Sequence, residues 1–340
     1  MQRPRDRIEG EAGIVALLRP LAAAFSGALG LCDDCAELAP APGQDLVLKC
    51  DPVREGLHFL SDDDPADIAW KALAANVSDL AAKSARPVAY LLALSFPEHP
   101  ARDWLERFAA GLASAQEAFG ITLAGGDTDR APGPLSITVT VIGEVPAGRM
   151  VRRAAAERGD VLFVSGTLGD AALGLKLRRD GGLAASAVLD ESEAVYLIGR
   201  YLRPVPRLGL KAALRNHARA AMDVSDGLAK DLGRMLTASA GSAGRRMGAT
   251  VRAADVPLSD PFRRARAAGL ASLEDAVAHG DDYEVLAAVP AAAAADFAAS
   301  AAAGGVPVTA IGAIEDREGL RIVDTAGFEV ALSRRGWDHF

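Results

Sequence analysis

Aspartates recur at the ends of the strands that this sequence predicts, and their placement restricts the fold more than any other feature. Asp51 ends an apolar strand, Asp127 follows two glycines after another, and Asp223 and Asp226 lie at a strand-to-helix junction. Strand ends are where open α/β folds place their ligand sites. A carboxylate bordered by apolar strand is destabilising there unless a positive group meets it. The chain must therefore bring a cation to these side chains.

The number and type of these side chains predict which cation it is. Several carboxylates on one rim would repel each other unless a cation lay between them. Magnesium takes oxygen ligands from a few carboxylates and keeps positions for phosphates, whereas the cysteine–histidine sets typical of zinc are missing from the sequence. The glycines of 125–126 and of 165–170 offer backbone N–H groups to phosphate oxygens. We therefore expect a site for magnesium and phosphate.

Each of these features also has a plainer explanation when it is taken alone. Asp33-Asp34 could be a solvated turn or a helix cap, and Asp226 could be the N-cap of a helix over 228–236. The segment 165–170 is not a Walker A loop, because no Gly-Lys-Ser/Thr follows it. Cys32 and Cys35 could mark redox chemistry or half of a zinc site, although no second pair completes that site.

Hydrophobic periodicity predicts alternating strands and helices, and hence an α/β or α+β fold. In the first half we expect strands at 46–50, 88–95, 121–124 and 135–145, and helices at 66–84 and 103–119. In the second half we expect strands at 161–164 and 284–289, short strands within 306–332, helices from 170 and at 191–201, 207–215 and 291–303, and a strand-to-helix junction at 221–234. A turn-rich stretch at 146–159 separates the halves, so we expect domains at 1–147 and 148–340.

Composition excludes several classes of function. With 340 residues the chain is longer than one hydrophobic core usually covers, which favours two domains. A net charge of −8 provides no basic field for a nucleic acid or an anionic membrane. We find no apolar run of the roughly 20 residues that span a bilayer and no signal-peptide core. The three cysteines fit reduced thiols, so we expect a cytoplasmic protein.

In this order and combination, the segments resemble thiamine-monophosphate kinase, a family of the aminoimidazole ribonucleotide synthetase-like superfamily. The resemblance extends along the whole chain and rests on residues 29–36, 51–59, 71–82, 125–128, 164–171, 203–207, 221–228, 280–284 and 336–340. Glu55-Gly-Leu-His-Phe59 and Trp337-Asp-His-Phe340 separate this family from its relatives. The resemblance implies mixed β-sheets flanked by helices in two domains, with ATP, metal and the dimer interface in the N-terminal domain. The C-terminal domain would complete the phosphate and substrate site.

The resemblance also implies roles for individual residues, with ATP and Mg2+ as cofactors and thiamine monophosphate as the acceptor. The magnesium ligands would be Asp34, Cys50, Asp51, Asp79, Asp127, Asp223 and Asp226. The ATP contacts would be Gly126, Asp127, Arg153 and Ser225, and the substrate contacts would be His58, Asp281 and Trp337. Catalysis would depend most on Asp79, Asp127 and Asp226. His58 could instead be a satisfied interior histidine, and Trp337 could be ordinary C-terminal packing.

Several positions depart from the family pattern. Lys49 and Cys50 stand where the family usually has Ser or Thr, so a hydroxyl ligand to one magnesium is lost, and Lys49 could contact a phosphate instead. Further departures occur at Cys32, Lys83-Ser84, Asp129 and His279. All of the proposed carboxylate ligands are retained.

The resemblance implies direct transfer from ATP by a homodimer, with no phosphoenzyme. A phosphate acceptor is already an anion at neutral pH, so no general base is needed. Two alternatives stay open: another ATP-using enzyme of the superfamily, such as an aminoimidazole ribonucleotide or selenophosphate synthetase, or a nucleotide-binding relative without turnover. A selenophosphate synthetase should carry a reactive cysteine near its N-terminus, and residues 1–30 contain none.

Overall fold

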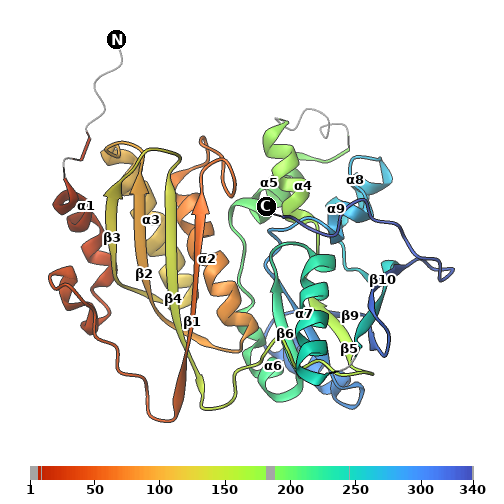
Figure 1. Ribbon diagram of the computed structural model, residues 1–340. Coiled ribbons are helices and arrows are strands. Elements are labelled where there is room, and N and C mark those ends of the chain that lie inside the picture. The colour runs from red at the N-terminus through yellow and green to blue at the C-terminus, as the bar shows by residue number, and fades with distance from the viewer. Residues whose placement is uncertain (1–6, 9, 181–187, 245, 339–340) are drawn as a thin grey trace. The chain divides into compact units, whose positions relative to one another are not determined.

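The computed structural model describes residues 7–8, 10–180, 188–244 and 246–338. Internal contacts divide the chain into two compact units, each with its own sheet (Figure 1). Unit 1 comprises Met1–Leu80 and Ala85–Gly148, and unit 2 comprises Ala81–Ser84 and Arg149–Phe340. The functional division that we expect between 1–147 and 148–340 stays a prediction.

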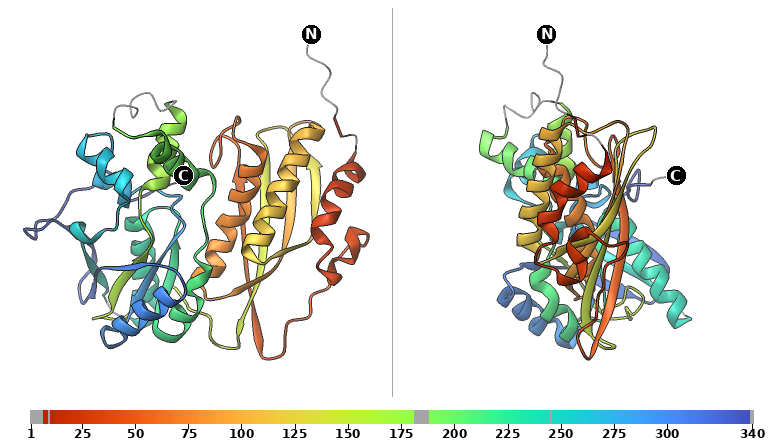
Figure 2. Two further views of the ribbon diagram at one scale, coloured as in Figure 1. Left: turned by 180° about the vertical axis from the view of Figure 1, so that it is seen from behind. Right: turned by 90° about the vertical axis from the view of Figure 1, so that its left-hand side faces the viewer.

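Unit 1 is built on a mixed four-stranded sheet in the order β1-β4-β2-β3. Its strands are β1 (Gln44–Arg54), β2 (Arg86–Phe96), β3 (Thr122–Arg130) and β4 (Ser136–Pro146). The β1–β4 and β4–β2 pairs are antiparallel, and β2 runs parallel to β3. The helices α2 (Pro65–Ala82) and α3 (Arg102–Phe119) lie on one face of this sheet (Figure 2), and α1 (Glu11–Leu18) contacts β3.

The sheet of unit 1 has one covered face and one open face. Successive side chains of a strand point to opposite faces. On β1, Val47 and Val53 are buried, whereas Leu48 between them is 64% exposed. The helices α2 and α3 pack closely because Gly111 lets the backbones approach: a Cβ there would lie 2.4 Å from the Ala66 carbonyl oxygen. The covered face therefore forms the core, and the open face keeps apolar side chains in contact with solvent.

Unit 2 is built on a mixed six-stranded sheet in the order β10-β7-β9-β5-β8-β6, in which β10 and β7 are parallel. Its strands are β5 (Val161–Ser165), β6 (Ala220–Val224), β7 (Gly248–Arg252), β8 (Glu284–Val289), β9 (Val308–Glu315) and β10 (Gly319–Val323). All residues of β6 and β8 are buried, as is typical of strands covered on both faces.

Helices cover both faces of the unit 2 sheet. The two helices α6 (Lys211–His217) and α10 (Ala294–Ala303) pack with Phe163, Ala221 and Val285 on one face. The opposite face packs against α4 (Asp170–Arg179), α5 (Glu191–Leu202), α7 (Leu228–Ala243), α8 (Asp260–Ala267) and α9 (Leu273–Val277). The hydrophobic core of unit 2 therefore consists of two layers of side chains, one on each side of the sheet.

The expected fold class is confirmed, and so are most of the expected elements. The strands β1 and β3 continue beyond their expected ends, to Arg54 and Arg130, so Asp51 and Asp127 lie within strands and the expectation that they lie at strand ends is wrong. The helix expected at 207–215 begins later, at Lys211, after a short 3-10 turn at Leu208–Leu210. The elements α1, β7, α8 and α9 were not predicted; all are short, and α8 is rich in charged residues. Among the described residues, no helix has the length and apolar character needed to cross a membrane.

Candidate functional site

A cavity of about 680 Å³ in unit 1 brings together several of the predicted site residues. Its lining includes Asp34, Gly126 and Asp127, with Asp33 and Cys35 beside them. The aspartates come from two segments far apart in the sequence, the loop before β1 and the strand β3. Carboxylate oxygens at the wall of an open cavity are the donors that magnesium prefers. Among the described residues, no three acidic, histidine or cysteine side chains gather closely enough to hold a metal ion by themselves. The structure therefore brings Asp34 and Asp127 to the wall of one cavity, and a magnesium ion there would need further ligands such as phosphate oxygens and water.

The position of Asp127 depends on the close pairing of β3 with β2. Asp127 lies opposite Ala93 in the parallel register. At Gly126 an added Cβ would lie 1.8 Å from the Leu92 carbonyl oxygen, so the register requires glycine there. The Asp127 carboxylate is exposed and accepts a hydrogen bond from the Thr128 N–H at 2.9 Å. The second glycine of the pair is thus explained by sheet packing, whether or not it contacts a nucleotide.

Two further predicted ligands of unit 1, Asp51 and Asp79, meet a lysine. The Lys49 ammonium lies 2.9 Å from Asp51 Oδ2 and 3.0 Å from Asp79 Oδ2. Lys49 and Asp51 project from the covered face of β1 toward α2, which carries Asp79. Asn76 of α2 accepts a hydrogen bond from the Asp51 N–H at 2.9 Å and so holds the strand to the helix. Burial lowers the pKa of Lys49, but the charges and hydrogen bonds of Asp79 and Asp51 outweigh it and raise the pKa above its usual value.

The structure separates Cys50 from this group. Cys50 is exposed and lies on the open face of β1, because neighbouring residues of a strand point to opposite sides. Its thiol is therefore not brought to Asp51 and Asp79. His58 follows β1 in a turn, where its Nδ1 accepts a hydrogen bond from the Arg54 N–H at 3.0 Å. The ring is half-buried, so His58 is not an interior histidine.

In unit 2, backbone hydrogen bonds bring together four predicted site residues from three segments. The Asp281 N–H donates to the Ser225 carbonyl oxygen at 2.9 Å. The Trp337 N–H donates to the Asp226 carbonyl oxygen at 3.0 Å. The predicted nucleotide contact Ser225, the predicted metal ligand Asp226 and the two predicted substrate contacts are therefore neighbours. His339 and Phe340, which belong to the same terminal motif as Trp337, lie outside the described residues.

The loop that carries Asp281 has an unusual backbone. Asp281 and Tyr283 have φ angles of 69° and 50°, in the left-handed region that side chains other than glycine rarely adopt. Asp282 between them is buried, and its carboxylate oxygens accept hydrogen bonds from the Gly169 N–H at 3.0 and 3.1 Å. Burial raises the pKa of Asp282 well above its usual value. Strained backbone of this kind clusters at functional sites.

Asp226 is not the N-cap of the following helix. The helix α7 begins after Gly227 without a side-chain cap. Instead, Asp231 accepts hydrogen bonds from the Ser225 and Asp226 N–H groups at 3.0 and 2.9 Å, and its own burial raises its pKa to about 6. The Asp226 carboxylate pairs with Arg234 at 2.6 Å. The alternative of a simple helix cap at Asp226 is therefore wrong.

In the glycine-rich segment 165–170, three of the N–H groups that we expected to be open to phosphate already have acceptors within the protein. The Gly166 N–H donates to the Pro307 carbonyl oxygen at 3.0 Å, and the Leu168 N–H donates to the Pro257 carbonyl oxygen at 2.9 Å. The Gly169 N–H donates to Asp282. These three donors already have protein acceptors, so they are not open to a phosphate, and a phosphate site at this segment stays a prediction for its other N–H groups.

Sequence reasoning missed a buried ionic cluster next to this segment. Glu284, which is fully buried, accepts hydrogen bonds from the Ser165 hydroxyl at 2.6 Å, from Arg200 Nη2 at 2.8 Å and from Arg207 Nε at 2.6 Å. Arg207 and Glu284 are the last residues of two segments on which the family resemblance rests, 203–207 and 280–284. Their opposite charges in these two segments were the sequence signal that could have predicted the cluster. The cluster fixes the end of the loop that carries Asp281.

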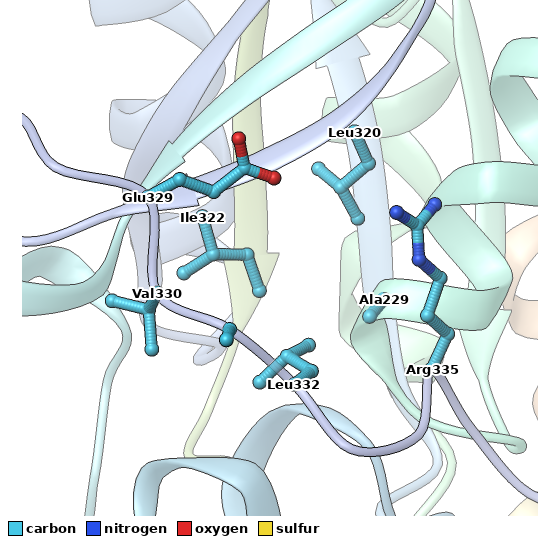
Figure 3. A pocket seen from close by; sticks show the side chains of 8 residues that line it. Ala229, Leu320, Ile322, Glu329, Val330, Leu332 and Arg335 are labelled. Atoms are coloured by element: carbon cyan, nitrogen blue, oxygen red, sulfur yellow. The ribbon is translucent and has the colours of Figure 1, made fainter.

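The remaining predicted residues of unit 2 lie as follows. Asp223 is buried on β6, opposite Val285 of β8, and Arg153 is exposed on the segment before β5. A smaller cavity of about 210 Å³ lies beside β10, with the apolar side chains of Leu320 and Ile322 in its wall (Figure 3). None of the predicted site residues lines this smaller cavity.

Comparison with family models covers most of the chain. A model described as AIR synthase related protein, N-terminal domain, matches residues 32–145, and its C-terminal counterpart matches residues 157–325. A thiamine-monophosphate kinase of Salmonella typhimurium is 42% identical over 312 residues, which cover 92% of this chain and 91% of that protein.

Solved structures have the same fold. The crystal structure of thiamine-monophosphate kinase from Stenotrophomonas maltophilia K279a superposes with a TM-score of 0.80 at 37% identity, over 93% of this chain and 96% of that one. A structure of AaThiL complexed with AMPPCP and TMP has a TM-score of 0.75 at 30% identity, over 97% of each chain.

Proposed function

Because the chain belongs to the thiamine-monophosphate kinase family of the AIR synthase related proteins, we propose that it transfers the terminal phosphate of ATP to thiamine monophosphate, which yields thiamine diphosphate. The observation that carries this proposal is the unit 1 cavity, whose lining includes Asp34, Gly126 and Asp127. The structural relative complexed with AMPPCP, an ATP analogue, and with TMP supports the pair of substrates. The cytoplasmic location also stays a proposal.

Each unit would contribute its own residues to the reaction. In unit 1, Asp34 and Asp127 would hold Mg2+ together with the phosphates of ATP, beside Gly126. In unit 2, Asp223 and Asp226 would hold Mg2+, which requires that the ion displace Arg234 from its 2.6 Å contact with Asp226. Ser225 and Arg153 would contact ATP. Bound magnesium would neutralise the charge of two phosphate groups that must approach each other. This assignment explains why carboxylates dominate the site.

The substrate contacts would be His58, Asp281 and Trp337. The indole of Trp337 is exposed, so its face is accessible to the positively charged thiazolium ring of the substrate. The contacts of Asp282 and Glu284 anchor the strained loop around Asp281, and the Tyr283 hydroxyl donates a hydrogen bond to the Asp281 carboxylate at 3.2 Å. A phosphate acceptor needs no proton removed, so we propose direct in-line transfer without a general base or a phosphoenzyme.

The identity of the phosphate acceptor distinguishes the proposed reaction from the alternative functions. The purified protein with ATP and magnesium should convert thiamine monophosphate to thiamine diphosphate, whereas free thiamine, which offers only a hydroxyl group, should not react. Chromatography of the thiamine phosphates measures both reactions. Comparable turnover of free thiamine, or ATP binding without any product, would exclude the proposed reaction. Parallel assays with the substrates of the two synthetases would identify a relative of different specificity.

We also propose that the chain forms a homodimer through the open face of the unit 1 sheet. Leu46 and Leu48 of β1 and Leu91 of β2 are exposed on this face, with β4 between their strands. Leu91 also lines the cavity, so the interface would border the proposed nucleotide site. An exposed group of large apolar side chains on a sheet is typical of a protein–protein interface. A second copy of the same face would cover these leucines.

Replacing Leu48 with Glu should convert the dimer to a monomer at micromolar concentration, because the new carboxylate would be buried against apolar side chains. Light scattering coupled to size-exclusion chromatography measures the molar mass. The matched control is Val195→Glu, since Val195 of α5 in unit 2 is 65% exposed, close to the value for Leu48. A wild-type monomer, or a Leu48→Glu variant that stays dimeric, contradicts this interface.

A further inference from the structure

We propose that the ammonium group of Lys49 is a built-in cation for Asp51 and Asp79, and that it takes the place that a divalent metal ion would hold between these two carboxylates. The inference rests on the proposed function, because the family resemblance makes both aspartates metal ligands. It revises that assignment for this chain: Asp51 and Asp79 have a permanent counter-charge, and the magnesium of unit 1 is left to Asp34 and Asp127.

The geometry shows one cation shared by two anions. Lys49 Nζ lies at hydrogen-bond distance from both carboxylates, 2.9 Å from Asp51 and 3.0 Å from Asp79. An ammonium group has three N–H donors, so it can serve both oxygens at once. The partners come from β1 and α2, which Asn76 holds together at this point. The carboxylates are therefore placed by secondary structure and not by a flexible loop.

The environment makes this contact stronger than a surface ion pair. The side chains of Lys49 and Asp79 are only 33% and 25% exposed, since α2 covers this face of β1, whereas that of Asp51 is 50% exposed, so the effect of burial is largest for the Lys49–Asp79 pair. Opposite charges attract more strongly where water is partly excluded. Exposed ion pairs, by contrast, contribute little because water and salt screen them. Lys49 therefore offsets the repulsion between the two carboxylates without a bound ligand.

A metal ion and the Lys49 ammonium exclude each other at these oxygens. Magnesium binds carboxylate oxygens at about 2.0–2.1 Å. An ion at that distance from Asp51 and Asp79 would lie next to the ammonium group and would be repelled by it. Serine or threonine at position 49 would carry no charge and would add an oxygen donor. The change from a hydroxyl to an amine therefore replaces a metal ligand with a competing cation.

Counting bound Mn2+ tests the inference directly. Electron paramagnetic resonance of the full chain with Mn2+ and AMPPCP measures the number of ions bound per chain and needs no turnover. Lys49→Ser should bind one more ion than wild type. Asp79→Asn in the wild-type background should bind as many as wild type, because Asp79 holds no metal there. The matched control is Lys176→Ser, an exposed lysine of α4 in unit 2, which should also leave the number unchanged.

Melting temperatures give a second readout. In chelator, Lys49→Ser should melt below wild type, because the two carboxylates lose their counter-charge. Mn2+ should then raise the melting temperature of Lys49→Ser more than that of wild type. Lys49→Arg, which keeps the charge, should melt near wild type in chelator.

Two results would overturn the inference: equal ion numbers in wild type and Lys49→Ser, or the loss of an ion in Asp79→Asn. The measurement on Asp79→Asn tests the inference even if Lys49→Ser fails to fold. None of these readouts depends on phosphate transfer, so failure of the inference can be told apart from failure of the proposed function, which the thiamine monophosphate assay tests separately.

Discussion

Replacing Asp127 with Asn should lower the rate of thiamine diphosphate formation by at least about a hundredfold, the usual effect of removing one electrostatic contact to a reacting group. The same variant should melt no lower than wild type in chelator. No ion pair joins the exposed Asp127 carboxylate to any described residue, and Asp34 lines the same cavity. Removing one of two like charges does not weaken the folded state. Rate assays and thermal melts in chelator measure the two effects.

Adding magnesium and ATP should reverse the order of stability. A ligand that binds only the folded protein stabilises it by mass action, and Asp127→Asn would bind this ligand less tightly than wild type. Asp129→Asn is the matched control, because Asp129 is two residues further along β3, is also exposed and does not line the cavity. A variant Asp127→Asn with normal turnover and a lower melting temperature in chelator would remove Asp127 from the site.

Replacing Glu284 with Ala should destabilise unit 2 by about 3–5 kcal/mol, the cost of breaking a buried ion pair by removing one partner. The substitution leaves the guanidinium groups of Arg200 and Arg207 without their shared carboxylate, and these side chains are only 11% and 19% exposed. It also removes the acceptor of the Ser165 hydroxyl. For a unit of this size the melting temperature should fall by roughly 6–20 °C.

Two further variants test whether the charge of Glu284 and its burial cause this loss. Glu284→Gln keeps an acceptor oxygen for the arginines and should lose less stability than Glu284→Ala. Glu98→Ala removes a carboxylate that pairs with Arg7 at 2.9 Å but is 67% exposed, and it should change the melting temperature little. Equal melting of Glu284→Ala and wild type would mean that the cluster contributes nothing to the fold.

Local pattern was sufficient for the regular elements. The periodicity of α3 predicted a helix because Leu105, Phe108 and Leu112 recur at helical spacing, and all three are buried in the structure. Strands such as β8 were recognisable as continuous apolar runs between turn residues. The helix α8 was missed because it has only eight residues, of which most are charged or alanine, and its one large buried side chain, Phe262, leaves no repeat to detect.

The sequence by itself determined which kind of chemistry this protein can support. Aspartates that border predicted strands, glycines beside one of them and the absence of a basic field all follow from residue types and spacing, and they predicted a carboxylate site for magnesium and phosphate, although Asp51 and Asp127 lie within strands and not at their ends. The tertiary structure alone decided which carboxylates already have a cation, because charge pairing depends on distance in space. Lys49 meets Asp79, 30 positions further along the chain, at 3.0 Å, and Arg234 meets Asp226 at 2.6 Å across two turns of a helix. Similarly, three N–H groups of the glycine-rich segment donate to Pro257, Asp282 and Pro307, which no local pattern connects to it.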